Sequence, residues 1–127
     1  MDLGLTVGDD LDRLAAASER FDFYELGIGE PTLVPDDIDP DRLDRALAGR
    51  DLLVHLPYSQ PLTSYAPEVN EAIVTYQRRL LDAAGDLGAE KAVLHATSAD
   101  RDDVDFRDVA ADQLRRVADA GREAGVE

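Results

Sequence analysis

The stretch DLLVHLPYSQPL, residues 51–62, carries an apolar run directly into a histidine and then into a loop with two prolines. A second stretch, KAVLHATS at residues 91–98, repeats this arrangement, since its histidine also closes a short apolar run before a polar loop. Short apolar runs that end in turn-forming residues are typical of buried strands. The two histidines of the chain, His55 and His95, are therefore expected at the ends of two strands.

Strand and helix patterns alternate four times along the 127 residues. The proline-rich loop GEPTLVPDDIDP, residues 29–40, is expected to hold no regular element. Apolar continuity, helical periodicity and capping residues predict strands at 3–8, 21–28, 51–56 and 91–96, and helices at 11–20, 41–48, 68–84 and 105–124. Apolar strands that are always separated by helices favour a parallel sheet covered by those helices. The sequence thus predicts a single α/β domain of four βα units over residues 1–127.

Two architectures satisfy this order of elements, a doubly wound sheet and half of a (β/α)8 barrel. Four units in 127 residues correspond to half of the roughly 250 residues that such a barrel occupies. Val126 and Glu127 are then expected to begin a fifth strand. A half barrel has uncovered strand edges and an uncovered inner face. We therefore expect a homo-oligomer, most simply a dimer, or association with a chain that carries the other half barrel.

Composition narrows the classes of partner. Asp and Glu number 28 against 13 Lys and Arg, for a net charge of -15. Nucleic acid is not an expected partner, because phosphate backbones are bound by clustered basic residues and the basic residues here are scattered among carboxylates. The acidic, lysine-poor composition, with Lys91 as its single lysine, resembles that of proteins from salt-loving archaea. In multimolar salt such a surface is largely screened, so its acidity can reflect the habitat.

The lack of other signals points to a cytoplasmic protein. The chain contains no cysteine, which excludes disulfides and thiolate metal sites. No apolar stretch approaches the roughly 20 residues that a membrane span requires, so no membrane association is expected. The start MDLGLTVGDD lacks the basic region of a secretory signal.

Both histidines occupy positions where parallel α/β folds gather functional groups, at the carboxyl ends of strands. Each follows a strand core of four residues, and Glu25 in DFYELGIGE lies late in the second expected strand. For a single histidine at a strand end, a hydrogen bond to a nearby carbonyl would be a sufficient explanation. Two histidines in equivalent positions on adjacent strands favour a shared role. Imidazoles bind divalent zinc or manganese, although a catalytic zinc needs about three protein ligands. A carboxylate such as Glu25 or Asp100 would have to complete that site, and a general acid or base role is the alternative.

Other conspicuous residues are given structural roles. Tyr76 lies on the apolar face of the helix expected at 68–84, which favours packing over chemistry. Two arginine pairs, Arg78 with Arg79 and Arg115 with Arg116, are expected on solvent faces of helices. Acidic residues one turn away on the same helices are their expected partners.

The run VHLPYSQPL resembles the H-x-P-Y segment of the xylose isomerase-like TIM-barrel superfamily. That superfamily includes sugar phosphate isomerases and epimerases, inosose dehydratase-like proteins and endonuclease IV. FDFYELGIGE is similar to the second strand of the family, with Glu25 at its acidic position, and KAVLHATS is similar to the fourth strand. After His95, Ala96 and Thr97 stand where the family often has proline and glycine. The resemblance covers residues 1–127 and corresponds to the first half of the family's barrel.

This resemblance implies a sugar phosphate isomerase- or epimerase-like protein that acts on a sugar or polyol and depends on a divalent metal. Glu25, His55 and His95 would be catalytic, Tyr58 would contact the substrate, and the two histidines would bind the metal. In the isomerases and epimerases the metal is held mainly by residues of strands five to eight. In the endonuclease branch, the residues that match His55 and His95 bind zinc, and the tyrosine that matches Tyr58 lies near the nucleic acid.

Three interpretations therefore stay open at the level of the sequence. The first is a sugar isomerase-like half barrel, which need not be active by itself. The second is a DNA repair protein of the endonuclease IV kind, against which the acidic composition argues. The third is a non-catalytic half barrel that only folds and dimerises.

Overall fold

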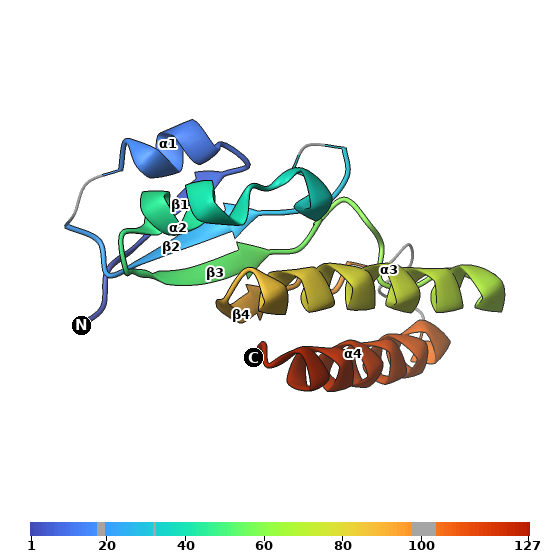
Figure 1. The fold of residues 1–127 in the computed structure, drawn as a ribbon. Helices are drawn as coiled ribbons and strands as arrows, with labels where there is room; N and C mark the ends of the chain where they lie inside the picture. The colour runs from blue at the N-terminus through green and yellow to red at the C-terminus, as the bar shows by residue number, and fades with distance from the viewer. Residues whose placement is uncertain (18–19, 32, 98–103) are drawn as a thin grey trace.

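The computed structural model describes residues 1–17, 20–31, 33–97 and 104–127, with the backbone alone at residues 104 and 105. Its elements are β1 (Gly4–Gly8), α1 (Leu11–Ala15), β2 (Phe23–Gly27), the short 3-10 helix η1 (Pro35–Asp37), α2 (Pro40–Leu47), β3 (Asp51–His55), α3 (Pro67–Asp86), β4 (Ala89–Val93) and α4 (Val104–Ala124) (Figure 1). The four strands form one parallel sheet in the order β1-β2-β3-β4. The prediction of an α/β fold with four βα units is confirmed.

Only one face of the sheet is covered by helices in the described part of the chain. In β3, Leu52 and Val54 are at most 2% exposed and belong to the hydrophobic core. Leu53 and His55 alternate with them, are only partly buried, and lie outside that core. Because side chains alternate across a strand, Leu53 and His55 point to the opposite face. This second face, called the inner face below, is the one that a barrel would enclose.

The helices pair along the outer face. Figure 1 shows α1 beside α2, and α3 beside α4, and both pairs are in contact. The ends of α3 and α4 come together closely at Gly85, where a Cβ atom would lie 2.4 Å from the carbonyl oxygen of Ala124. In the described ranges, no helix is both long and apolar enough to cross a bilayer.

The segment after α4 runs along the edge of β4. The N–H of Glu127 donates to the carbonyl oxygen of Glu90 at 2.9 Å, and the N–H of Ala92 donates to the carbonyl oxygen of Glu127 at 2.8 Å. This is the hydrogen-bond pattern of a parallel ladder. Val126 is 2% exposed. Residues 126–127 therefore lie where the sequence predicted the beginning of a fifth strand.

Two predictions in the first half of the chain were wrong. The helix predicted at 11–20 ends at Ala15, because Leu11 and Leu14 are its only buried side chains and the alanines that follow offer little apolar area to bury. Residues 18 and 19 lie outside the described part. The loop at 29–40, expected to be irregular, contains η1, which begins with Pro35 at a position where its missing N–H is not needed.

The strand predicted at 91–96 is displaced by about two residues. β4 begins at Ala89, directly after Gly88 with φ of +80°, and ends at Val93. At the end of β4, the N–H of Leu56, directly after β3, donates a hydrogen bond to the carbonyl oxygen of Val93 at 2.9 Å. His95 therefore lies in the loop after β4, and the prediction that it occupies a position equivalent to His55 was wrong.

Candidate functional site

The two histidines meet at the carboxyl end of the sheet in spite of this displacement. The Nε2 atoms of His55 and His95 are 3.0 Å apart, and their ring centroids are separated by 4.9 Å. His55 is the last residue of β3 and pairs in register with Val93, two residues before His95. Adjacent parallel strands bring their ends to one edge, which explains how residues 40 positions apart come into contact.

A backbone hydrogen bond fixes the proton arrangement of the His55 ring. Its Nδ1 lies 2.9 Å from the carbonyl oxygen of Leu56, and a carbonyl oxygen can only accept. Nδ1 therefore carries a proton, and in the neutral ring the lone pair is on Nε2. The Nε2–H of His95 then donates to His55 Nε2. An imidazole whose Nδ1–H donates to a backbone carbonyl and whose Nε2 carries the lone pair is the usual form of a histidine metal ligand. A cation held by both rings would replace the proton between the two Nε2 atoms.

Loop contacts hold His95 beside the third strand. The N–H of Thr97 donates to the carbonyl oxygen of His95 at 2.8 Å, and the N–H of Leu62 donates to that of Thr97 at 2.7 Å. The Thr97 hydroxyl also donates to the carbonyl oxygen of Gln60, at 3.2 Å. The loop after β3 therefore fixes the segment after β4. Asp100, the other carboxylate suggested by the sequence, lies outside the described residues.

A hollow of about 270 Å³ opens next to His55 at the ends of β1, β2 and β3. Tyr58 lines it, is 69% exposed, and places its ring edge-on to His95 at a centroid distance of 6.4 Å. Asp9 and Glu30 also line this hollow. The structure thus brings together His55, His95 and Tyr58 of the four predicted site residues.

Glu25 lies apart from this hollow. It pairs in register with Thr6 and Leu53 in the middle of the sheet, and its carboxylate accepts a hydrogen bond from the Thr6 hydroxyl at 3.1 Å. Its side chain is on the inner face, one residue pair deeper than Gly27 and His55. Glu25 therefore faces the space that a barrel would enclose and does not line the hollow.

Glu30 is the site residue that the sequence patterns did not indicate. Its Oε2 accepts a hydrogen bond from the Tyr76 hydroxyl at 2.7 Å, and its Oε1 accepts one from the guanidinium of Arg79. The backbone N–H of Glu30 donates back to the Tyr76 oxygen at 3.2 Å. The Arg79 guanidinium also lies over the Tyr76 ring, 5.3 Å from its centroid. Tyr76, predicted to be a packing residue, thus joins α3 to the loop after β2.

These contacts shift the titration of the three groups. The Tyr76 hydroxyl, followed by Arg79, lowers the pKa of the Glu30 carboxyl below its ordinary value, because both donate to the charged form. Burial, followed by the hydrogen bond to Glu30, raises the pKa of Tyr76. The hydrogen bond and the charge of Glu30 raise the pKa of Arg79. Glu30 therefore stays negatively charged at neutral pH.

The imidazole pair fits a divalent cation as two of its ligands. Two nitrogens bound to a tetrahedral zinc at about 2.05 Å lie roughly 3.3 Å apart, close to the observed 3.0 Å. Across the described ranges, no group of three or more His, Asp or Glu side chains gathers around one point. The remaining ligands of such a cation would have to come from water, substrate oxygens or another chain.

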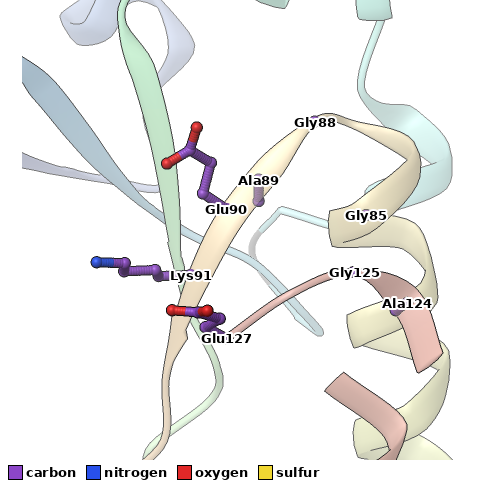
Figure 2. A pocket seen from close by; sticks show the side chains of 8 residues that line it. All are labelled: Gly85, Gly88, Ala89, Glu90, Lys91, Ala124, Gly125 and Glu127. Carbon is purple, nitrogen blue, oxygen red and sulfur yellow. The ribbon is translucent and has the colours of Figure 1, made fainter. Parts of the chain in front are cut away.

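A larger hollow, of about 490 Å³, lies at the other end of β4 (Figure 2). Its walls are largely backbone and small residues from the ends of α3 and α4, with Gly85, Gly88 and Gly125 among them. Figure 2 shows Lys91, which also lines it, extending away from both helices. Because the polar side chains of this hollow do not converge on one point, we place the functional site at the imidazole end.

Comparison with protein families finds a match to the sequence model of the xylose isomerase-like TIM barrel, over residues 13–127. No match is found among curated proteins. Several solved structures share the fold. A D-psicose 3-epimerase, determined in the presence of D-fructose, has a TM-score of 0.76 at 14% identity, with 100% of this chain and 50% of that chain covered.

Two other solved structures contain or were soaked with metals. A protein from Thermus thermophilus, soaked with ZnCl2, has a TM-score of 0.70 at 26% identity, over 99% of this chain and 54% of that chain. A xylose isomerase-like TIM-barrel protein from Mycobacterium smegmatis, in complex with magnesium, has a TM-score of 0.65 at 17% identity, over 99% and 53%. The chain thus spans about half the length of the structures that it matches.

Proposed function

Because the chain belongs to the xylose isomerase-like TIM-barrel family, we propose that it is a sugar isomerase- or epimerase-like protein that binds a divalent cation through His55 and His95. The 3.0 Å separation of the two Nε2 atoms at the carboxyl edge of the sheet carries this proposal. Sugar epimerases among the solved structures of this fold support a sugar or polyol as the substrate class. Zinc and manganese are the cations that imidazole ligands suit.

Each site residue receives a role from its position. A bound cation would act as a Lewis acid toward the hydroxyl or carbonyl oxygens of the substrate. His55 and His95 hold it with their Nε2 atoms, and the carbonyl of Leu56 keeps the His55 ring in the required tautomer. Tyr58 presents an exposed ring and hydroxyl to the substrate beside His95. Glu25, on the inner face, is the carboxylate proposed to exchange a proton with a substrate that enters that space.

Zinc binding by wild-type and histidine variants tests the proposal. The titration is performed by calorimetry with excess Mg²⁺ present, because 28 carboxylates otherwise bind zinc weakly throughout the surface. Replacement His55→Ala or His95→Ala removes one of two protein ligands and should weaken the specific site by at least about tenfold, the loss that even indirect changes around a metal cause. Tyr65→Phe serves as control, since Tyr65 is 72% exposed and packs on Phe106. Equal zinc affinity in wild type and both histidine variants would contradict the proposal.

A zinc-binding imidazole pair is also what the resemblance to endonuclease IV implies. Two of the residues that line the hollow beside His55, Asp9 and Glu30, are acidic, and the chain has a net charge of -15, which disfavours binding of a phosphate backbone. Two assays on the zinc-loaded protein separate the candidates, epimerisation of D-fructose and cleavage of a duplex that contains an abasic site. Cleavage that is lost in His95→Ala would favour the repair function, and epimerisation that is lost in the same variant would favour the sugar function.

We further propose that a second copy of the chain covers the inner face. Phe23, Leu53 and Val93 are only partly buried there and lie outside the core. Glu25, Leu53 and Lys91 pair in one row across β2, β3 and β4, so that opposite charges flank an apolar centre. A twofold axis parallel to β3 would place Glu25 of each copy opposite Lys91 of the other. Such a face is complementary to itself.

A charge exchange tests this arrangement. At 2 M KCl, which screens the net charge of -15, sedimentation of the wild type should show a dimer. Glu25→Lys should weaken the dimer, because it places a lysine of each copy opposite Lys91 of the other. The double variant Glu25→Lys with Lys91→Glu should restore the dimer. A wild-type monomer under these conditions, or equal association in all three proteins, would contradict the proposal and leave a chain carrying the other half barrel as the partner to seek.

A further inference from the structure

We propose that Tyr76 and Glu30 are positioning residues that orient the His55 imidazole through Gly29 and Pro57. The inference rests on the proposed function of the imidazole pair, but it concerns the geometry of that pair and can be tested without a metal. It assigns a site role to a tyrosine on α3 that touches neither histidine.

The first step runs from α3 to the loop after β2. The Tyr76 hydroxyl donates to the Glu30 carboxylate and accepts from the Glu30 backbone N–H, so that one oxygen binds the residue at two points. Arg79, one turn further along α3, binds the second carboxylate oxygen. Glu30 is thereby fixed in both backbone and side chain. The lowered pKa of Glu30 agrees with these contacts, since it keeps the carboxylate charged and able to accept both hydrogen bonds.

The second step runs from this loop to Pro57. Gly29 is buried with φ of +111°, and its N–H donates to the carbonyl oxygen of Leu33 at 2.8 Å. A Cβ atom on Gly29 would lie 2.5 Å from Cγ of Pro57 and 2.8 Å from the Tyr76 hydroxyl oxygen. Gly29 therefore fills a narrow space between Pro57 and Tyr76, and each of these side chains limits the movement of the other.

The third step runs from Pro57 to the histidine. The carbonyl oxygen that receives the His55 Nδ1–H belongs to Leu56, whose carbonyl carbon is bonded to the Pro57 nitrogen. Because the peptide unit is planar, the position of the Pro57 ring sets the direction of that carbonyl. The carbonyl in turn sets the tautomer and the orientation of the His55 ring, and thus the direction of Nε2 toward His95. Contacts alone therefore connect the Tyr76 hydroxyl to the imidazole pair.

The variant Tyr76→Phe tests this connection, because it removes the hydroxyl and keeps the ring. The matched control is Tyr65→Phe, which removes a hydroxyl from an exposed tyrosine whose ring packs on Phe106. The chain has two histidines, so long-range ¹H–¹⁵N spectra of the metal-free protein resolve both imidazoles and report their tautomers. We expect wild type and Tyr65→Phe to show His55 protonated at Nδ1 only. Tyr76→Phe should show a mixture of both neutral tautomers.

Two further measurements follow, of which the first checks the contact between Tyr76 and Glu30 and the second separates positioning from a merely structural role. Titration of the ¹³C carboxyl signal of Glu30 should give a higher pKa in Tyr76→Phe than in wild type, because the first of its two side-chain donors is lost. Zinc affinity, measured well below the unfolding temperature, should fall by about tenfold in Tyr76→Phe and stay unchanged in Tyr65→Phe. A purely structural role would lower the unfolding temperature and raise the Glu30 pKa, but it would leave the zinc affinity unchanged.

The outcomes distinguish this inference from the proposed function. If wild type binds no zinc but its His55 tautomer changes in Tyr76→Phe, the metal function is wrong and the positioning role stands. If zinc binds through the two histidines and neither the tautomer nor the affinity changes in Tyr76→Phe, the positioning role is wrong and the metal function stands. Should Tyr76→Phe fail to fold, Glu30→Gln is used in its place, with the same tautomer readout deciding the matter.

Discussion

At the scale of single residues, Glu30 differs from the histidines because its position next to the site cannot be recognised from the sequence. His55 and His95 close apolar runs and can be singled out in the sequence. Glu30 is one of 28 acidic residues, and its role depends on Tyr76 and Arg79, which are 46 and 49 positions away. A long-range pair of this kind leaves no periodic pattern, because its two sides belong to different elements.

The lowered pKa of Glu30 predicts a pH dependence of stability. A carboxyl whose pKa is lower in the folded state than in the unfolded state stabilises the fold above its ordinary pKa of 4.5. That contribution is lost as the pH falls through the folded-state value. Thermal unfolding of wild type and Glu30→Gln should therefore differ most above pH 4.5 and converge at lower pH. A difference that grows as the pH falls would contradict the contacts described for Glu30.

A glycine between two side chains provides the second residue-scale prediction. Gly29→Ala combines a positive φ with contacts below 3 Å to Pro57 and Tyr76, and should lower the free energy of unfolding by about 3 kcal/mol or more. Gly49→Ala is the matched control, since its φ is +79° but nothing lies within 4 Å of the added Cβ. It should cost only about 1–2 kcal/mol. Urea unfolding of both variants measures the difference, and equal losses would show that crowding at Gly29 is unimportant.

At the scale of elements, local sequence signals predicted the bounds of most helices closely, but they misplaced the bounds of one strand, β4. Asp39 and Pro40 begin α2 as capping rules predict, and Pro67 begins α3. β4 was misplaced because its bounds depend on pairing with β3, where Ala89 and Val93 lie opposite Leu52 and His55. The arginine partners were misassigned in the same way. Arg78 and Arg79 bind acidic residues of other elements, and so does Arg116, while the sequence predicted partners one turn away.

The cap of α2 gives the prediction at this scale. The Asp39 carboxylate accepts hydrogen bonds from the N–H groups of Asp41 at 3.0 Å and Arg42 at 3.3 Å. Asp39→Ala leaves these two donors without a side-chain acceptor and should lower the free energy of unfolding by about 1 kcal/mol. Asp39→Asn keeps an acceptor oxygen and should lose much less. Equal losses in the two variants, measured by urea unfolding, would mean that the charge of Asp39 matters more than its hydrogen bonds.

At the scale of the whole molecule, charge and topology act in different ways. The sequential parallel sheet brings the strand ends to one edge and thereby creates the site. The net charge of -15 opposes any compact state through self-repulsion. The ion pairs that the structure describes are all between side chains at least one-third exposed, so they stabilise the fold only weakly.

We therefore predict that salt stabilises the protein. Between 0.1 and 1 M salt the Debye length falls from about 10 to 3 Å, which removes most of the long-range repulsion. The urea midpoint should rise over this range of KCl, measured at a protein concentration low enough to exclude association. A variant with three exposed carboxylates neutralised, Asp82→Asn with Asp108→Asn and Asp112→Asn, should gain less from salt. A falling midpoint would show that the exposed ion pairs dominate.

The sequence by itself determined the α/β class, the four βα units and the approach of the two histidines. These features follow from local properties, namely apolar runs, helical periodicity, caps and the rule that parallel strands end at one edge. Only the tertiary structure decided that Glu30 lines the hollow beside His55 while Glu25 lies deeper on the inner face, and that Tyr76 on α3 binds Glu30. It also decided that His95 lies two residues beyond the register of His55. Such features depend on contacts between elements far apart in the chain, which no local pattern encodes.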